Sequence, residues 1–283
     1  MGEKLKTYKK HPVSFLFFLL VSLAALITVA IFVCLVGYIV VRGIPYLKPS
    51  LFALEYTSEN VSVTPAIITT LYMVAFSLVI AVPFGIFCAI YLVEYAKKGN
   101  KLVKAIRVTT ETLSGIPSIV YGLFGMLFFV TQLKWSYSLI AGAFTLAIMI
   151  LPLIIRSTEE ALKAVDDSYR EGSFGLGAGK LRTVFRIVLP SAMPGILAGI
   201  ILAIGRVIGE SAALIYTAGT VAQIPKNVFQ SGRTLAIHMY ALSSEGLHTN
   251  EANATAMVLL ITVFAINGIA SLIAKRLQKG RGA

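Results

Sequence analysis

The stretch SYREGSFGLGAGKLRTVFRIVLPSAMPGILAGIILAIGRVIGESAALIYT (residues 168–217) decides the fold. Its first residue, Ser168, forms a Ser-x-x-Glu capping box with Glu171, which predicts a short helix beginning near Tyr169. Gly177 and Gly179 are expected to end that helix, because glycine readily adopts the left-handed conformation found at helix C-termini. The stretch therefore begins with one short, capped helix.

A second short helix is predicted directly after these glycines. Its apolar residues are spaced i, i+3, i+4, i+7, which places them on one helical face: Leu181, Val184, Phe185 and Val188. Pro190 ends this pattern, and a long apolar helix follows. The whole segment, residues 156–190, is thus predicted to be an elbow outside the membrane that passes motion from a soluble partner to a membrane helix.

The composition identifies the class of protein. The chain has 283 residues, of which 57% are hydrophobic and 13% charged, and its mean hydropathy is +0.83. Soluble domains carry about 25% charged residues, so the chain is predicted to be a polytopic membrane protein. Cys34 and Cys88 lie in apolar runs and the three histidines are scattered, so no disulfide, metal site or cofactor is expected.

Six apolar segments are each about 18 residues or longer, which is enough to cross a hydrocarbon core of roughly 30 Å. They cover residues 13–41, 64–93, 111–133, 138–155, 191–217 and 252–274. The first is too long for the core of a cleaved signal peptide, so we interpret it as a retained span. The predicted fold class is an all-α polytopic membrane protein with six transmembrane helices.

The charged residues between these segments predict the orientation. Of the 25 lysines and arginines, 19 lie on the side of residues 1–12, 94–110, 156–190 and 275–283, and five lie on the other side. By the positive-inside rule, both termini and the elbow are expected in the cytoplasm. The net charge of +12 then reflects cytoplasmic loops rather than binding to nucleic acid.

The glycine-rich run GSFGLGAGK (residues 172–180) is not a nucleotide-binding loop. A phosphate loop requires a glycine where Phe174 stands and a serine or threonine where Leu181 stands. The chain is therefore not expected to be an enzyme that hydrolyses nucleotides itself, and its energy is expected to come from a partner.

Arg206 and Glu210 are the only clear charges deep inside a predicted span. Four residues apart on one helix, they would share a face and pair, and intramembrane charges mark functional sites by default. Arg206 would lie roughly 24 Å along the helix from Pro190, past the midplane toward the outer side. We interpret the two as lining the substrate pathway; mutual neutralisation inside the bundle is the alternative.

Two further motifs leave alternatives open. Gly195-x3-Gly199 and Gly205-x3-Gly209 permit close helix approach, either within this chain or against a second subunit. The run SGIPS (residues 114–118) is expected to kink or unwind the start of the third span. That break would either expose backbone to a pathway or let two helices cross.

The elbow also resembles the cytoplasmic loop E-A-A-x3-G-x9-I-x-L-P of the binding-protein-dependent ABC importer permeases. Glu171, Gly177 and Pro190 fall at that spacing, and Gly172 and Ser173 replace the two alanines. The resemblance implies that this loop couples the membrane domain to an ATPase. The residues to which it assigns that role are Tyr169, Arg170, Glu171, Gly172, Ser173 and Gly177.

The segments LSGIPSIVYGLFG (residues 113–125) and GRVIGESAALIYTAG (residues 205–219) resemble the phosphate-specific branch of this family. The resemblance implies a type I ABC importer membrane domain over residues 64–274, in a bacterial or archaeal cell membrane. It also implies phosphate as substrate, with a second permease, a cytoplasmic ATPase dimer and an extracytoplasmic phosphate-binding protein as partners. The alternatives are a permease for another oxyanion (sulfate or molybdate class), an ion-coupled secondary transporter, and a scaffold that transports nothing.

Overall fold

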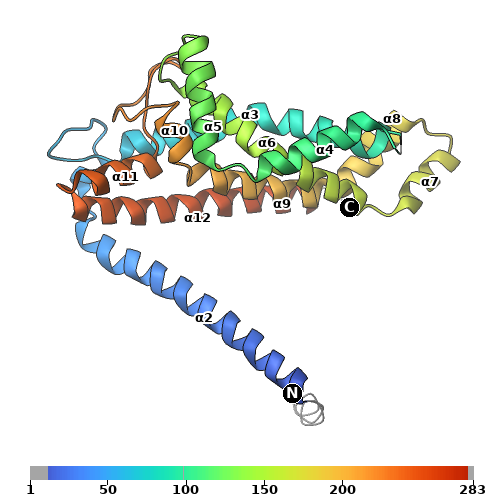
Figure 1. Ribbon diagram of the computed structural model, residues 1–283, viewed down its shortest axis with the longest axis horizontal. Helices are drawn as coiled ribbons and strands as arrows, with labels where there is room; N and C mark the ends of the chain where they lie inside the picture. Colours follow the sequence, from blue (N-terminus) through green and yellow to red (C-terminus); the bar gives the residue numbers. More distant parts are fainter. Residues whose placement is uncertain (1–11, 98, 280–283) are drawn as a thin grey trace.

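The computed structural model describes residues 12–97 and 99–279, and within them the regular structure is entirely helical. Figure 1 shows most of these helices running along the long axis of a single bundle. The helices are α2 (Pro12–Gly43), α3 (Thr64–Ile90), α4 (Lys101–Ser114), α5 (Ser118–Gly125), α6 (Leu139–Lys163), α7 (Asp167–Gly175), α8 (Lys180–Thr183), α9 (Leu189–Ile208), α10 (Ala212–Ile215), α11 (Leu235–Glu245) and α12 (Thr249–Lys279).

The structure confirms an all-α membrane protein. Five helices are long and apolar enough to span a membrane, and a sixth span results if the bent pair of α4 and α5 is counted as one. Short π-helical segments extend α3, α5 and α8, and α8 continues through one of them into α9. We call the end that carries α7 and α8 the elbow end, and the opposite end the outer end.

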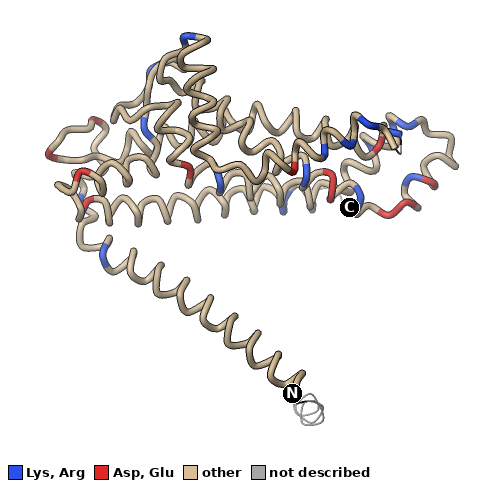
Figure 2. Tube along the Cα trace, in the orientation of Figure 1, with Lys and Arg blue, Asp and Glu red and all other residues tan. Residues whose placement is uncertain are grey.

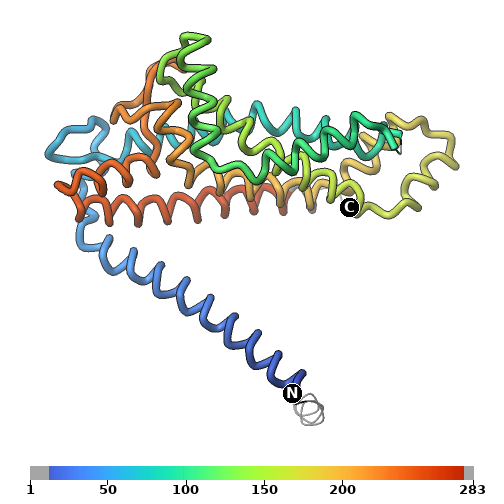
Figure 3. Tube along the Cα trace, viewed as in Figure 1, coloured from blue at the N-terminus to red at the C-terminus, as the bar shows by residue number. Residues whose placement is uncertain are grey.

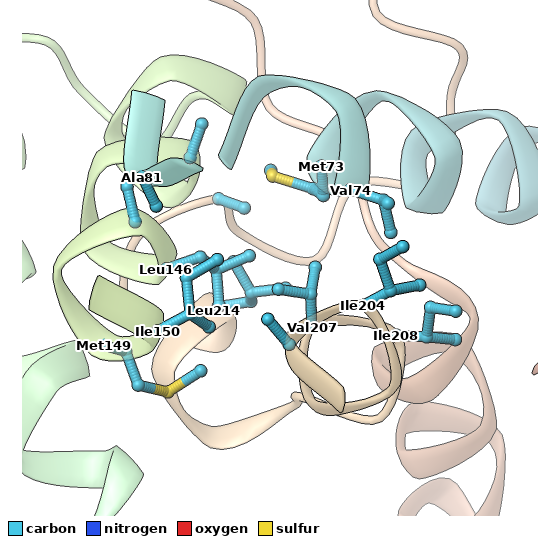
Figure 4. Packing of buried hydrophobic residues seen from close by; sticks show 14 of the residues in the cluster. Met73, Val74, Ala81, Leu146, Met149, Ile150, Ile204, Val207, Ile208 and Leu214 are labelled. Atoms are coloured by element: carbon cyan, nitrogen blue, oxygen red, sulfur yellow. The ribbon is translucent and has the colours of Figure 1, made fainter. Parts of the chain in front are cut away.

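The core lies where α3, α6 and α9 meet. Met73 and Val74 of α3 pack against residues of α6 such as Leu146 and Ile150, and Val207 of α9 completes the contact (Figure 4). All five side chains are buried. In lipid this packing takes the place of the hydrophobic drive between helices, so these three helices form the rigid centre of the molecule.

Small residues let α9 approach α6 closely. A Cβ atom on Gly195 would lie 2.7 Å from the Cβ of Ala161, and one on Gly199 would collide with Ser157. Replacing either glycine with a larger residue would therefore force the two helices apart. The Gly195-x3-Gly199 strip thus packs within this chain, which decides between the two alternatives that its sequence left open.

Helix α2 stands apart from the bundle, as the tube in Figure 3 shows. None of its apolar window is buried inside the molecule. It joins the bundle at its end, where a Cβ atom on Gly43 would lie 2.8 Å from the Cβ of Met257 in α12. The exposed apolar surface of α2 is therefore the surface expected to face lipid or another membrane helix.

The third predicted span, residues 111–133, is broken near its start, so that only residues 118–132 form its continuous helical part. Helix α4 ends at Ser114, α5 begins at Ser118, and their axes differ by 104°. Pro117 supplies no backbone donor and disfavours helical geometry in the residue before it, so the chain turns here. The expected break in the SGIPS run is confirmed, and its consequence is larger than a kink.

The basic connection predicted for residues 94–110 is also partly wrong. The Asn100 side chain accepts a hydrogen bond from the Leu102 amide at 2.9 Å and caps α4, which begins at Lys101. Asparagine is among the best capping residues. Most of this predicted loop is therefore an amphipathic helix at the elbow end.

The fifth predicted span, residues 191–217, ends early. Helix α9 stops at Ile208, with Gly209 at its C-cap, and only the short α10 follows. Between α10 and α12 the chain forms an outer connection, residues 218–248, which contains the unpredicted helix α11. The other spans differ from prediction at their ends only; α12, for example, continues past Ala274 to Lys279.

We predict that the elbow end and both chain termini face the cytoplasm. Lys and Arg gather at the elbow end around α4 and α8 (Figure 2), in agreement with the charge distribution along the sequence. With Cys34 and Cys88 replaced by alanine, an impermeant maleimide should label a cysteine at Leu247, which is 83% exposed at the outer end. Cysteines at Gly2 and Ala283 should react only after permeabilisation; labelling of either from outside would contradict this orientation.

Candidate coupling loop and charged cavity

Helix α7 begins earlier than its capping box predicts. Asp166, not Ser168, is the N-cap: its carboxylate accepts a hydrogen bond from the Ser168 amide at 2.8 Å. Hydrogen bonds from Ser168 lower the pKa of Asp166, so the carboxylate stays ionised near neutral pH and the cap persists. The prediction of a short helix is confirmed, but the role of Glu171 as a capping residue is wrong.

Arg170 ties α7 to the membrane helices. Its Nη2 lies 2.8 Å from Oε1 of Glu94, just beyond α3, and the side chains are only 15% and 8% exposed. The guanidinium also donates to the carbonyl oxygens of Leu162 and Val165 at 2.9 Å each. Because both charges are mostly buried, losing either would leave the other without compensation.

Apolar side chains on α7 and at its C-cap are partly exposed. Tyr169, Phe174 and Leu176 are 56%, 47% and 91% exposed. Ser173 lies beneath them, where its hydroxyl is 2.8 Å from that of Thr183 in α8. The elbow therefore exposes apolar side chains, while polar contacts of Arg170 and Ser173 hold it to Glu94 and to α8. Glu171 and Gly172 are exposed on the same helix.

Gly177 has φ of +80°, which confirms the predicted glycine stop after α7. A Cβ atom there would meet nothing within 4 Å, so only the backbone conformation requires glycine. Gly179 instead has φ of −73° and is the N-cap of α8, so its predicted role as a helix stop is wrong.

Arg206 and Glu210 do not share a helix face. Because α9 ends at Ile208, the i, i+4 relation fails, and Glu210 instead accepts a hydrogen bond from the Ala213 amide at 3.0 Å. Among the described residues no ion pair joins Arg206 to Glu210. The predicted pairing is wrong; the buried Glu210 instead binds the first turn of α10, just before the N-cap residue Ser211.

Arg206 lines a cavity of about 460 Å³. The same cavity is bounded by Arg107 and Glu111 of α4 and by Arg156 and Glu159 of α6. Arg107 lies 2.6 Å from the buried Glu159, which Lys163 also contacts at 2.6 Å. Three arginines and two carboxylates thus line this cavity. Because the positive side chains outnumber the negative ones, the cavity is suited to an anion.

The depth of Arg206 differs from the sequence estimate. Gly195 packs on Ala161 and Gly199 on Ser157, so extending this antiparallel register places Arg206 level with Ile150. That is about 16 Å from the outer end of α6, close to the middle of the helix rather than beyond it. The cavity extends from there toward the elbow end, as far as Glu159.

Sequence reasoning missed Arg107, Arg156 and Glu159 as neighbours of Arg206. They lie at the ends of predicted spans, where charges are ordinary and carry no signal. Only the fold of α4 against α6 gathers them. Arg156 and Glu159 each had a local signal only for a different partner, because Glu160 and Lys163, four residues later, pair with them at 3.0 and 2.6 Å.

A second group of polar side chains lies buried at the outer end. His238 of α11 is fully buried and meets the Tyr56 ring edge-on at 6.0 Å, and Arg233 lies 4.8 Å from the centre of that ring. Burial and the nearby charge of Arg233 lower the pKa of His238 to about 3. His238 is therefore neutral in the folded protein at any physiological pH.

We expect acidification to destabilise this outer region through His238. Between about pH 6.5 and 3 the unfolded chain binds a proton that the folded chain excludes, so stability falls as pH falls. At pH 5 the loss is roughly 2 kcal/mol. Thermal unfolding at pH 7.5 and pH 5 should show that His238→Gln removes this pH dependence. His248→Gln, at a partly exposed histidine, should keep it; an unchanged slope in His238→Gln would contradict the assignment.

Comparison with known families identifies the class of protein. The family of binding-protein-dependent transport system inner membrane components matches residues 81–282. The chain belongs to this family of importer permeases.

Individual relatives cover most of the chain. It is 34% identical to the Probable ABC transporter permease protein YqgI of Bacillus subtilis, over 87% of this chain and 90% of that protein. It is 36% identical to the Phosphate transport system permease protein PstA of Pasteurella multocida, over 80% of this chain and 84% of that protein. PstA 1 of Mycobacterium tuberculosis is also 36% identical, over 74% of this chain and 68% of that protein.

The fold matches that of solved ABC importers. A chain of the bacterial alginate ABC transporter superposes with a TM-score of 0.68 over 96% of this chain and 98% of its own length, at 16% identity. A chain of the MetNI methionine ABC transporter superposes with a TM-score of 0.60 over 76% of this chain and 94% of its own length, at 21% identity. At such identities the likeness supports the type I permease architecture and no particular substrate.

Proposed function

We propose that the chain is a PstA-type permease subunit that takes inorganic phosphate into the cell as part of an ATP-driven importer. The observation that carries the proposal is the elbow: a short helix at the family spacing, with exposed apolar side chains, that Arg170 binds to the membrane helices. The phosphate transport permeases at 36% identity support the substrate. Neither a secondary transporter nor a scaffold needs such a loop.

The partners follow from this proposal. A second permease of the PstC kind would complete the pathway, two copies of a PstB-like ATPase would bind the elbows, and a PstS-like protein would deliver phosphate from outside. Closure of the ATPases on ATP would pull the elbows together and switch the cavity between its two faces. Coupling must be conformational, because a ligand shifts an equilibrium only through its differential affinity for the two states.

The residues of α7 would make the ATPase contact. Tyr169 and Phe174 would bury their exposed rings in a groove of the ATPase, with Glu171 and Gly172 at its edge. Arg170 would transmit the motion to Glu94, and thereby to α3. Gly177 and the Ser173 contact with Thr183 would keep α7 at a fixed angle to α8.

Arg206 would meet phosphate in the charged cavity. A guanidinium offers two parallel hydrogen bonds that fit an oxyanion. Arg206 forms no ion pair with any carboxylate that the structure describes, so its guanidinium is free to bind an oxyanion. Glu210 would contribute to this pathway indirectly. Its hydrogen bond with the Ala213 amide would fix the bend of the chain between α9 and α10, just after Arg206. It would shape the end of the pathway rather than neutralise the arginine.

Cross-linking tests the coupling contact. In a complex without its native cysteines, a cysteine at Phe174 should cross-link to one in the ATPase groove, with a yield that changes when ATP binds. A cysteine at Leu247, exposed at the outer end, is the matched control and should never cross-link. Absence of cross-linking along the whole of α7 in every nucleotide state would contradict the proposal.

A permease for another oxyanion is not favoured by the relatives. Competition distinguishes the two: excess sulfate or molybdate should leave labelled phosphate uptake unchanged. Selectivity of this kind rests mostly on the external binding protein, so the experiment must use the complete importer.

A further inference from the structure

A second, larger cavity lies at the elbow end and adjoins the cavity of Arg206. Its volume is about 740 Å³, and it is bounded by the end of α3, by α4, and by the junction of α6 and α7. Cations outnumber carboxylates on its walls. The cations are Lys97, Lys104, Arg107, Lys163 and Arg170, and the carboxylates are Glu94, Glu111 and Asp167.

Not all of these cations are compensated within the chain. Arg107 and Lys163 share Glu159, and Arg170 binds Glu94 and Asp167. Lys97 and Lys104 form no ion pair with any residue that the structure describes. Two free ammonium groups therefore face one cavity, and they would gain most from an anionic group with several oxygen acceptors, such as a phosphate.

Three features place the cavity at the level of lipid headgroups. Tyr91 and Tyr95, at the end of α3, are 39% and 41% exposed, and tyrosines of this kind gather at the membrane interface. Helix α4 carries Leu102, which is 56% exposed, beside Lys101 near its start, so apolar and ammonium groups lie at the same level there. The walls also include the half-buried Val93 and the exposed Val108, which suit the glycerol region of a lipid rather than a free ion.

We propose that this cavity binds the headgroup of an anionic phospholipid, with Lys97 and Lys104 contacting its phosphate. A free inorganic phosphate offers the same oxygen acceptors but would leave the apolar wall unused. The headgroup would lie beside Arg170, the residue that joins α7 to Glu94. The cavity adjoins that of Arg206 and shares Leu92, Arg107 and Glu111 with it, but Lys97 and Lys104 line only the larger cavity. The proposal does not depend on the transported substrate.

Native mass spectrometry of the purified full chain tests the site. The chain is offered phosphatidylglycerol, phosphatidylcholine or inorganic phosphate separately, and bound adducts are counted. Wild type should retain phosphatidylglycerol in preference to phosphatidylcholine. The double variant Lys97→Gln/Lys104→Gln should retain about tenfold less phosphatidylglycerol.

The control double variant, Lys101→Gln/Arg186→Gln, removes the same charge from exposed positions outside the cavity and should bind as wild type does. Circular dichroism checks that both variants keep their helices, as expected for exposed side chains. Equal retention of phosphatidylglycerol by the two double variants, or no preference over phosphatidylcholine in wild type, would overturn the proposal. A phosphate adduct lost in the cavity variant without any lipid preference would also overturn it, in favour of a free-ion site.

Discussion

Replacing Arg206 with glutamine is expected to lower phosphate uptake at least about a hundredfold. Glutamine keeps a polar side chain but removes the positive charge, which would lose roughly 3 kcal/mol of interaction with a desolvated anion. Assembly should be unaffected, because Arg206 forms no ion pair within the described chain and the core of α9 packs through Val207 and Ile208. Uptake of labelled phosphate into vesicles, normalised to assembled complex, measures the effect.

Two variants make this prediction specific. Arg206→Lys should recover only part of the uptake, because lysine keeps the charge and loses the planar fork. Arg276→Gln, at an exposed arginine on α12, should transport normally. Undiminished uptake by an assembled Arg206→Gln complex would show that Arg206 is no part of the phosphate pathway.

Replacing Arg170 with methionine is expected to uncouple ATP hydrolysis from transport. The change leaves the buried Glu94 without its partner, and breaking a buried pair costs about 3 kcal/mol. Helix α7 would still form, because Asp166 caps it, but it would no longer be fixed to the end of α3. We expect phosphate transported per ATP hydrolysed to fall at least about tenfold, with ATPase activity retained.

Asp167→Asn is the matched control, because it removes the other ion pair of Arg170, in which the Asp167 side chain is 85% exposed. Exposed pairs contribute at most about 1 kcal/mol, so its transport ratio should stay near that of wild type. Gly177→Val should resemble Arg170→Met, since valine at φ of +80° costs about 1–2 kcal/mol and would redirect the chain after α7. A normal ratio of transport to hydrolysis in Arg170→Met would contradict the coupling route.

The elbow was predictable because its signals are local. The glycine stop at Gly177 and the spacing to Pro190 depend only on neighbouring residues. The start of α7 was mistaken because Asp166 and Ser168 are both good capping residues two positions apart, and the Glu three residues after Ser168 favoured the wrong one. The observed cap at Asp166 gives α7 two further residues at its start.

The ends of the third and fifth spans were mistaken for a different reason. Apolar runs predict where a chain can lie in a membrane, not where its helix stops. Gly209 ends α9 although apolar residues continue beyond it. Conversely, α4 is polar enough to read as a loop, yet the Asn100 cap and its amphipathic pattern make it helical.

The contacts that define the site could not be predicted from one sequence. Arg170 and Glu94 are 76 residues apart, and Arg107 reaches Glu159 across two helices. Such pairs depend on how α4 and α7 pack against α3 and α6. The sequence placed Arg206 correctly as a deep charge, but its partner was assigned from helical periodicity that Gly209 interrupts.

Phosphate uptake by the reconstituted importer tests the central claim most directly. The chain is incorporated into proteoliposomes with a second permease and the ATPase, and the phosphate-binding protein and labelled phosphate are added outside. We predict accumulation of phosphate that requires internal ATP, requires the binding protein and is lost in Arg206→Gln. Uptake that ignores ATP and follows an ion gradient instead, or accumulation of sulfate in place of phosphate, would contradict the account.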